Sequence, residues 1–178
     1  MLLENTIELS FAKSEQDLET VRGLMREYLV WHGTRYSDYH ELLERYFDYD
    51  GYQLEMDCLP GEYDSPKGCL LLARRGDDVD GCVALRDLGA GIAEMKRMFV
   101  RSRAQGSGIG KRLAKSVIQI ASALGYKTMR LDTGPLQTEA VNMYQKLGFK
   151  FIEPYYDLPP ALGEMLVFME CDLIESKL

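Results

Sequence analysis

The sequence has little of what marks several large classes of protein, beginning with long apolar runs. A membrane-spanning helix needs roughly 20 consecutive apolar residues, whereas no apolar run is longer than that of residues 69–73, which has only the length of a strand. The first five residues contain no basic region followed by an apolar stretch, so we expect no signal peptide. These absences predict a soluble, cytoplasmic protein that does not bind a membrane.

Histidine and cysteine are also scarce, and their spacing disfavours the common metal sites. The two histidines, His32 and His40, have no cysteine nearby in the sequence, and no Cys-x-x-Cys pair occurs. We therefore predict no metal site. Most of the cysteines lie in apolar, strand-like segments, which favours free, buried thiols in a reducing compartment. The four cysteines are Cys58, Cys69, Cys82 and Cys171.

Acidic residues are absent from one long segment of an otherwise acidic chain. Residues 95–131 contain nine of the 21 lysines and arginines and none of the 28 acids. Residues 38–64 have the opposite bias, with nine acids and one base. A basic segment in a protein of net charge −7 indicates a local anion site more than a nucleic-acid surface. A solvated basic helix face is the alternative.

The hydrophobic pattern predicts one domain over residues 1–178. A capping box at Ser14 and Asp17 marks the start of the first helix, and Gly125 and Gly148 are expected to end two later helices. Turn residues predict that segment 51–67 is irregular. The predicted strands are 6–12, 68–74, 81–88, 93–100, 128–133, 149–153 and 164–171, and the further helices are 39–47, 108–124 and 138–147.

The predicted order of elements, βααβββαβαββ, indicates a mixed α/β (α+β) fold. Strands 68–74 and 81–88 are separated by a turn and should form an antiparallel hairpin. The helix 108–124 joins strands 93–100 and 128–133 in a β-α-β crossover, which places these two strands parallel and side by side. We therefore expect a central sheet that is mostly antiparallel, with helices on both faces.

The glycine-rich turn before helix 108–124 carries the strongest functional signal. The sequence Gln105-Gly106-Ser107-Gly108-Ile109-Gly110-Lys111 would present unpaired backbone N–H groups at a helix N-terminus, which suits a diphosphate. A Walker loop is excluded because Gln105 and Arg112 occupy positions that need Gly and Ser or Thr. The dinucleotide fingerprint also fails, since its third glycine comes too early.

The turn resembles the acetyl-CoA signature of the GNAT superfamily, [Q/R]-x-x-G-x-[G/A], with Gln105, Gly108 and Gly110 at the fixed positions. A second segment, Ala140 to Phe149, resembles the family's A-x-x-x-Y-x-K-x-G-F pattern and contains Tyr144. The two motifs cover residues 94–149. The rest of the chain resembles the family only in its order of elements.

The resemblance implies an N-acetyltransferase that moves the acetyl group of acetyl-CoA directly to a primary amine of a small molecule or peptide. The backbone of residues 105–111 would hold the pyrophosphate, and residues 98–100 would pair with the pantetheine arm. The N–H of Met98 would lie near the developing oxyanion. The expected acetyl-CoA-binding residues are Met98, Phe99, Val100, Gln105, Gly106, Ser107, Gly108, Ile109, Gly110, Lys111 and Asn142.

Two residues are expected to carry the proton transfers. Tyr144 would protonate the departing thiolate, and Glu94 would take a proton from the substrate ammonium, through water. Structural roles remain alternatives: a core tyrosine on an amphipathic helix, and a salt bridge from Glu94 to a neighbouring base. A covalent mechanism is disfavoured because Cys69 and Cys82 lie in apolar runs without an adjacent histidine.

The identity of the acceptor rests only on the composition of residues 38–64. Carboxylates and aromatic rings together suit a cation, so a small amine or a lysine-like acceptor is expected, although a solvated acidic surface explains the same residues. A non-catalytic CoA-binding regulatory module is the rival function, and the presence of Tyr144 argues against it. No nucleic-acid partner is expected, and the oligomeric state stays open, a homodimer included. The tyrosines of the segment are Tyr39, Tyr46, Tyr49, Tyr52 and Tyr63.

Overall fold

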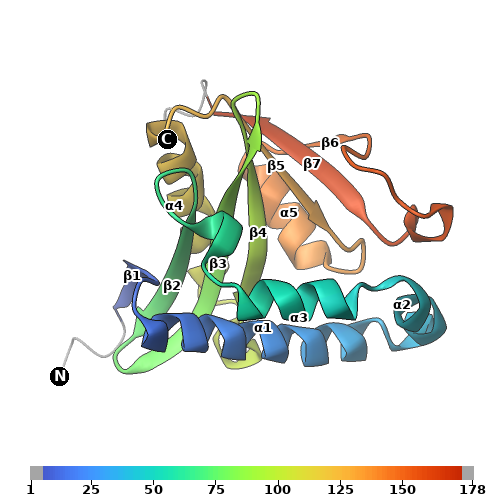
Figure 1. Cartoon of the computed structure of the whole chain (residues 1–178), viewed down its shortest axis with the longest axis horizontal. Coiled ribbons are helices and arrows are strands. Elements are labelled where there is room, and N and C mark those ends of the chain that lie inside the picture. The colour runs from blue at the N-terminus through green and yellow to red at the C-terminus, as the bar shows by residue number, and fades with distance from the viewer. Residues whose placement is uncertain (1–5, 174–178) are drawn as a thin grey trace.

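The computed structural model describes residues 6–173, in which seven strands form one sheet of order β1-β2-β3-β4-β5-β7-β6 (Figure 1). Residues 1–5, on which the expectation about a signal peptide rests, lie outside the described part. The strands are β1 (Ile7–Phe11), β2 (Cys69–Arg75), β3 (Asp78–Gly89), β4 (Ile92–Val100), β5 (Thr128–Thr133), β6 (Lys150–Ile152) and β7 (Val167–Asp172). The helices are α1 (Glu15–Arg35), α2 (His40–Tyr46), α3 (Tyr49–Asp57), α4 (Ile109–Ala123) and α5 (Thr138–Lys146).

The pairing of the strands confirms the predicted mixed sheet. Strands β1 to β4 pair antiparallel in sequence order, and β7 pairs antiparallel with both β5 and β6. Strands β4 and β5 are the parallel pair, as expected for the β-α-β crossover through α4. None of the described helices is both long and apolar enough to cross a membrane.

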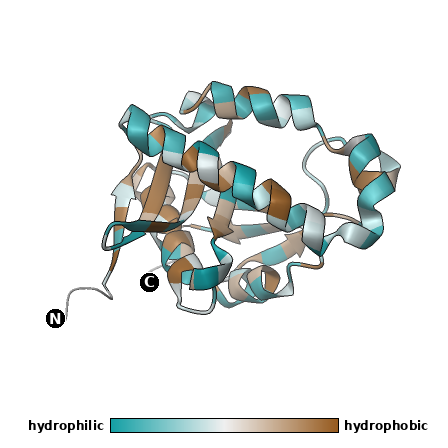
Figure 2. Cartoon of the chain, turned by 90° about the horizontal axis from the view of Figure 1, so that it is seen from below, coloured by the Kyte–Doolittle hydropathy of each residue, from teal (hydrophilic) through white to brown (hydrophobic). Residues whose placement is uncertain are grey.

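Two hydrophobic cores lie on opposite faces of the sheet, because the central strands are apolar on both sides. In β2, Leu71 and Ala73 belong to the core that contains the buried face of α4, whereas Leu70 and Leu72 belong to the core that contains buried residues of α1 and α3. Figure 1 shows α1 and α3 in front of the sheet, and in Figure 2 their ribbons alternate between teal and brown whereas the strands are mostly brown. Helices on both faces are what such two-sided strands require.

Several predicted boundaries are confirmed by their local chemistry. The side chain of Ser14 accepts a hydrogen bond from the N–H of Asp17, and the Asp17 carboxylate accepts one from the N–H of Ser14, which completes the capping box. Gly125 and Gly148 follow α4 and α5 with φ of +88° and +95°. Those left-handed conformations favour glycine and end the helices.

The sequence analysis missed helix α3, because it predicted that residues 51–67 are irregular. Asp48 caps this helix by accepting a hydrogen bond from the N–H of Gly51 at 2.8 Å. Tyr52 and Met56, one turn apart, are both buried in the core beneath α1. The burial of these two side chains stabilises a helix that has a glycine in its first turn.

Candidate active site

The parallel pair β4 and β5 separates in the middle of the sheet. The two strands are in register only from Ile92/Thr128 to Glu94/Arg130, and beyond that point no pairing continues. The second half of β4, including Met98 and Phe99, therefore lacks a strand partner on its β5 side. In Figure 1 the two strands diverge towards α3 and α5.

A bulge at Arg97 bends β4 at the point where the strands separate. Arg97 has φ of +54°, and the register between β3 and β4 shifts at this position. Its guanidinium pairs with both carboxylate oxygens of Glu55 and lies 4.5 Å from the centre of the Tyr52 ring. These contacts from α3 compensate for a backbone conformation that non-glycine residues rarely adopt.

A cavity of about 550 Å³ lies at this divergence. Its walls include residues 95–99 of β4, residues 131–134 at the end of β5, and side chains from α1, α3 and α5. Met98 and Phe99, both predicted to bind the donor, line it, and so does Tyr144. The volume lies in the range of small-molecule sites, roughly 300–1,000 Å³.

Tyr144 reaches the cavity from α5. Its side chain is 4% exposed and packs against the ring of Phe149 with 5.6 Å between centroids. Burial raises the pKa of Tyr144 well above its usual value, so the phenol stays protonated at neutral pH. Within residues 6–173 no hydrogen bond engages its hydroxyl, which leaves the proton available to a bound group.

The glycine-rich turn lies where β4 gives way to α4. Gly106 and Gly108 have φ of +78° and +86°, and Gly108 is the N-cap of α4. A Cβ atom at either position would meet nothing within 4 Å, so the backbone borders open space. Gln105 and Ser107 are exposed, and their side chains donate hydrogen bonds to the carbonyls of Val100 and Ala104.

The remaining residues of the turn are divided between packing and exposure. Ile109 is buried in the core, and a Cβ on Gly110 would lie 3.7 Å from Met143 and Val100, so Gly110 serves helix packing. Lys111 is exposed. Asn142, predicted to contact the donor, is exposed on α5 and does not line the cavity.

The predicted basic segment separates into paired and unpaired side chains. Five of its bases form salt bridges with acids elsewhere in the chain. Lys111, Arg112 and Lys115, in the first two turns of α4, have no salt-bridge partner among residues 6–173. Positive charge thus remains beside the helix N-terminus. The paired bases are Lys96, Arg97, Arg101, Arg103 and Arg130.

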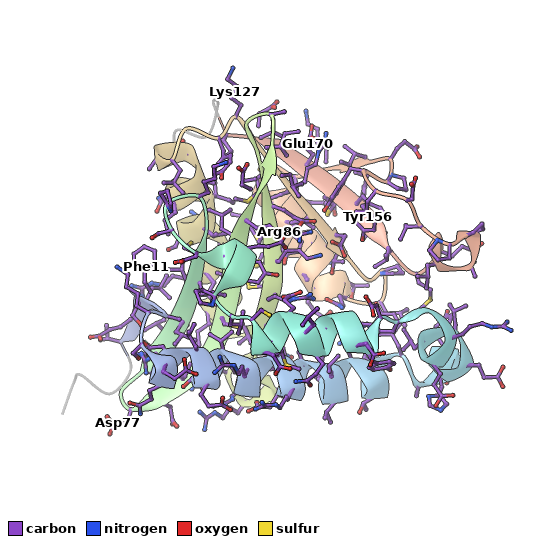
Figure 3. The ribbon with its side chains drawn as sticks, in the orientation of Figure 1. Phe11, Asp77, Arg86, Lys127, Tyr156 and Glu170 are labelled. Atoms are coloured by element: carbon purple, nitrogen blue, oxygen red, sulfur yellow. The ribbon has the colours of Figure 1, made fainter. Side chains whose placement is uncertain are left out.

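Glu94 does not face the cavity, contrary to the expectation. Its side chain is fully buried, one oxygen accepts from Arg86 and the other accepts from the hydroxyl of Tyr155 at 2.6 Å. Lys96 Nζ is 3.9 Å from the same carboxylate. The salt-bridge alternative therefore describes Glu94. Arg86 also borders a second hollow, together with Tyr156 (Figure 3).

Asp132 is the carboxylate that sequence analysis overlooked. It lies near the end of β5, lines the cavity, and pairs with Lys96 at 3.1 Å. Lys96 and Tyr156 line both hollows and so form the boundary between them. The sequence gives no signal that this aspartate lines a cavity, because the side chain is accessible only where β4 and β5 separate.

The cysteines follow the expectation of free thiols, buried where the sequence is apolar. Cys82 lines the cavity, but burial raises the pKa of its thiol to about 12, and its Sγ donates to the carbonyl of Arg97. It is therefore a poor nucleophile, as expected. Cys58, which lies outside the apolar strand-like runs, is exposed after α3. No group of three or more potential metal ligands occurs within the described residues.

The acidic segment is mostly a surface feature. Of its nine acids, only Asp48 and Glu55 line the cavity, and Glu55 is paired with Arg97. Tyr63 is buried and donates to Glu55, Tyr52 is buried beneath Arg97, and Tyr39 and Tyr49 are exposed. The solvated-surface alternative thus accounts for most of the segment.

Comparison with known proteins identifies relatives along most of the chain. The model of the Acetyltransferase (GNAT) family matches residues 33–149. An uncharacterized N-acetyltransferase of Schizosaccharomyces pombe is 34% identical over 161 residues, which cover 89% of this chain and 92% of that protein. The IAA acetyltransferase of Azospirillum brasilense is 38% identical over 101 residues, covering 56% of this chain and 65% of its own length.

Solved structures agree on the fold. The PaiA N-acetyltransferase of Thermoplasma acidophilum, solved in complex with coenzyme A, has a TM-score of 0.68 at 23% identity and covers 94% of this chain and 99% of its own. A GNAT-family acetyltransferase of Staphylococcus aureus has a TM-score of 0.70 at 21% identity, with 94% and 99% coverage. Together with the family match over more than half of the sequence, the separated strands, the glycine-rich turn and the buried Tyr144 lead to one conclusion: this chain belongs to the GNAT family and is an acyltransferase.

Proposed function

We propose that this protein transfers the acetyl group of acetyl-CoA to a primary amine, with both substrates bound at the same time. The observation that carries the proposal is the second half of β4, which has no strand partner on its β5 side and lines a cavity that Tyr144 also lines. Strand-like pairing of an extended ligand with a free strand edge is an established mode of recognition. The geometry offers such an edge inside the molecule.

The residues around the turn fit the donor. The N–H groups of residues 108–111 begin α4 and have no backbone partner within the helix, and the positive end of the helix dipole favours phosphate there. Lys111, Arg112 and Lys115 add charge. Acetyl-CoA supplies a thioester, whose acetyl carbon forms a bond to the amine nitrogen while its bond to sulfur breaks.

Two cavity side chains account for the protons. Tyr144 gives its proton to the departing sulfur; its raised pKa ensures that the hydroxyl carries this proton at neutral pH, and its place in the cavity lining is what supports the role. Asp132 takes a proton from the substrate ammonium through water, since it is the carboxylate of the cavity on the β5 side. Glu94 acts indirectly: with Arg86 and Tyr155 it fixes Lys96, the partner of Asp132. The N–H of Met98 is the oxyanion donor.

Binding of the donor tests the proposal directly. Titration calorimetry and thermal unfolding should reveal acetyl-CoA binding between low micromolar and sub-millimolar concentrations. A ligand at 100 times its Kd stabilises the folded state by about 2.7 kcal/mol. Absence of both heat and thermal stabilisation at millimolar acetyl-CoA would refute the function, whichever amine is offered.

A further inference from the structure

One end of the cavity is closed by residues far apart in sequence. Tyr36 and Leu43, from the α1–α2 side, form a buried cluster with Met165, which precedes β7. Leu42 and Leu162 pack against this cluster. In Figure 1, α2 and the segment before β7 lie at the same end of the molecule. We call this end of the cavity the distal pocket.

Most side chains that line the distal pocket are apolar. The cavity-lining residues from α2 and the loop that follows it are Leu43, Phe47 and the exposed Asp48, and the opposite wall comes from the segment between β6 and β7. That segment contributes no charged residue to the lining. Its lining residues are Tyr156, Leu158, Leu162, Met165 and Leu166.

Aromatic rings of α1 extend this lining towards the reaction centre. His32 lies 5.4 Å from the ring of Tyr28 and 6.2 Å from that of Phe47, and all three line the cavity. Burial lowers the pKa of His32, so its imidazole is neutral at pH 7 and does not repel a cation. These faces suit a planar or branched apolar group.

Two of the three cavity carboxylates are already neutralised by bases. Glu55 is paired with Arg97, and Asp132 is paired with Lys96. Asp48 is exposed and accepts the N–H of Gly51 as the cap of α3. A second positive charge held among the leucine and methionine side chains of the distal pocket would therefore be surrounded by apolar groups, which is costly.

From this lining we infer that the acceptor is a small monoamine whose single amino group is attached to an apolar, ring-sized body, and that the distal pocket binds this body. The inference rests on the proposed function and names its substrate class. It replaces the lysine-like acceptor expected from the acidic segment. The amine reaches Asp132 and Tyr144 while the apolar body occupies the distal pocket.

A matched set of amines tests the inference. Initial rates of CoA release should be measured with 2-phenylethylamine, hexylamine, 1,4-diaminobutane and a short peptide bearing a free N-terminus. We expect kcat/KM for the two apolar monoamines to exceed that of the diamine and the peptide by at least tenfold. A diamine or peptide that is the best acceptor would overturn the inference.

A pair of variants locates the apolar body. Leu158→Asp places a carboxylate on the half-buried wall of the distal pocket. It should lower kcat/KM for 2-phenylethylamine at least tenfold and raise it for the diamine, because the second ammonium gains a partner. Leu124→Asp, on an exposed leucine after α4, is the matched control and should change neither.

Measurements of folding and of acetyl-CoA binding distinguish a failure of the inference from a failure of the proposed function. Leu158→Asp should bind acetyl-CoA like the parent protein in calorimetry, and Leu158→Asn provides a milder polar change if the aspartate variant unfolds. Unchanged preference between the monoamine and diamine in a folded Leu158 variant overturns the distal pocket. Loss of acetyl-CoA binding by the parent protein would instead refute the proposed function.

Discussion

Tyr144 combines deep burial with a hydroxyl that has no partner among the described residues. We therefore expect Tyr144→Phe to lower kcat and kcat/KM about 10²-fold or more, since general-acid assistance acts only when charge develops on sulfur. Acetyl-CoA affinity should hardly change, and the stability cost should stay below about 1 kcal/mol. Single-turnover kinetics, calorimetry and thermal unfolding measure the three quantities.

The control for this change is another tyrosine. Tyr126 does not line the cavity and donates to the carbonyl of Lys67 at 2.8 Å. Tyr126→Phe should cost about 0.5–1.5 kcal/mol of stability through this lost bond and leave kcat unchanged. If Tyr144→Phe retained full kcat with chemistry rate-limiting, Tyr144 would be a packing residue only.

Substitutions at Asp132 and Glu94 distinguish the proposed base from a carboxylate with a structural role. Asp132→Asn should lower kcat/KM at pH 7, and the defect should shrink as pH rises towards about 10, where the free amine no longer needs a base. Glu94→Gln should mainly lower stability, by about 1–3 kcal/mol, because Arg86 loses a buried charged partner. Activity profiles over pH, together with urea unfolding, distinguish the two. A defect in Glu94→Gln that alone recovers at high pH would restore Glu94 as the base.

The sequence predicts a residue's place in the site only when the signal lies in neighbouring residues. Tyr144 could be predicted as a site residue from a ten-residue pattern, and in the structure it lines the cavity. Glu94 could not, because its partners Arg86 and Tyr155 come from β3 and from the loop after β6. The conformation of Arg97 was equally hidden, since Glu55 and Tyr52 reach it from a helix that sequence analysis missed.

Among the elements, α4 has a glycine at each end, and substituting each glycine in turn gives a matched pair of variants. Gly108 and Gly125 flank this helix with φ of +86° and +88°, and a Cβ at either would meet nothing within 4 Å. Valine at either position should cost a similar stability, about 1–2 kcal/mol, because the left-handed conformation disfavours a side chain. Only Gly108→Val should raise the KM for acetyl-CoA, by about tenfold or more. Equal KM values in the two variants would place the phosphate site elsewhere.

Long periodic elements were predictable, whereas short ones depended on contacts. The bounds of β5 match the prediction, and those of α4 and α5 differ by one residue at one or both ends, since their glycine stops and apolar spacing are local. Helix α3 was missed because Gly51 and nearby turn residues resemble a loop. Its stability comes from Tyr52 and Met56, whose burial depends on α1 and the sheet.

For the molecule as a whole, the distribution of charge predicts opposite salt effects on the two substrates. The Debye length is about 10 Å at 0.1 M salt, so exposed charges are screened readily. Raising salt to about 0.5 M should increase the KM for acetyl-CoA several-fold, because the cations at the start of α4 are exposed or half-buried and unpaired in the described residues. The KM for an apolar monoamine should change little or fall.

A double variant and its control identify the source of this effect. Lys111→Gln combined with Arg112→Gln should raise the KM for acetyl-CoA and flatten its salt dependence. Lys127→Gln, on an exposed lysine beyond the other end of α4, should keep the parent behaviour. An acceptor KM that rises more steeply with salt than the donor KM would return the acidic segment to the acceptor site.

The separation of β4 from β5 has a consequence for how the protein avoids self-association. Free strand edges normally template pairing between molecules, and proteins protect them at the rim of a sheet. Here an edge lies in the interior, between β4 and β5 of the described sheet, beside a cavity lined by Tyr144. Pairing with a second molecule would require a whole protein strand, with side chains on both faces, to enter between β4 and β5. The pantetheine arm of the proposed donor carries no side chains, so the enclosure that would admit this donor also disfavours self-association through the edge.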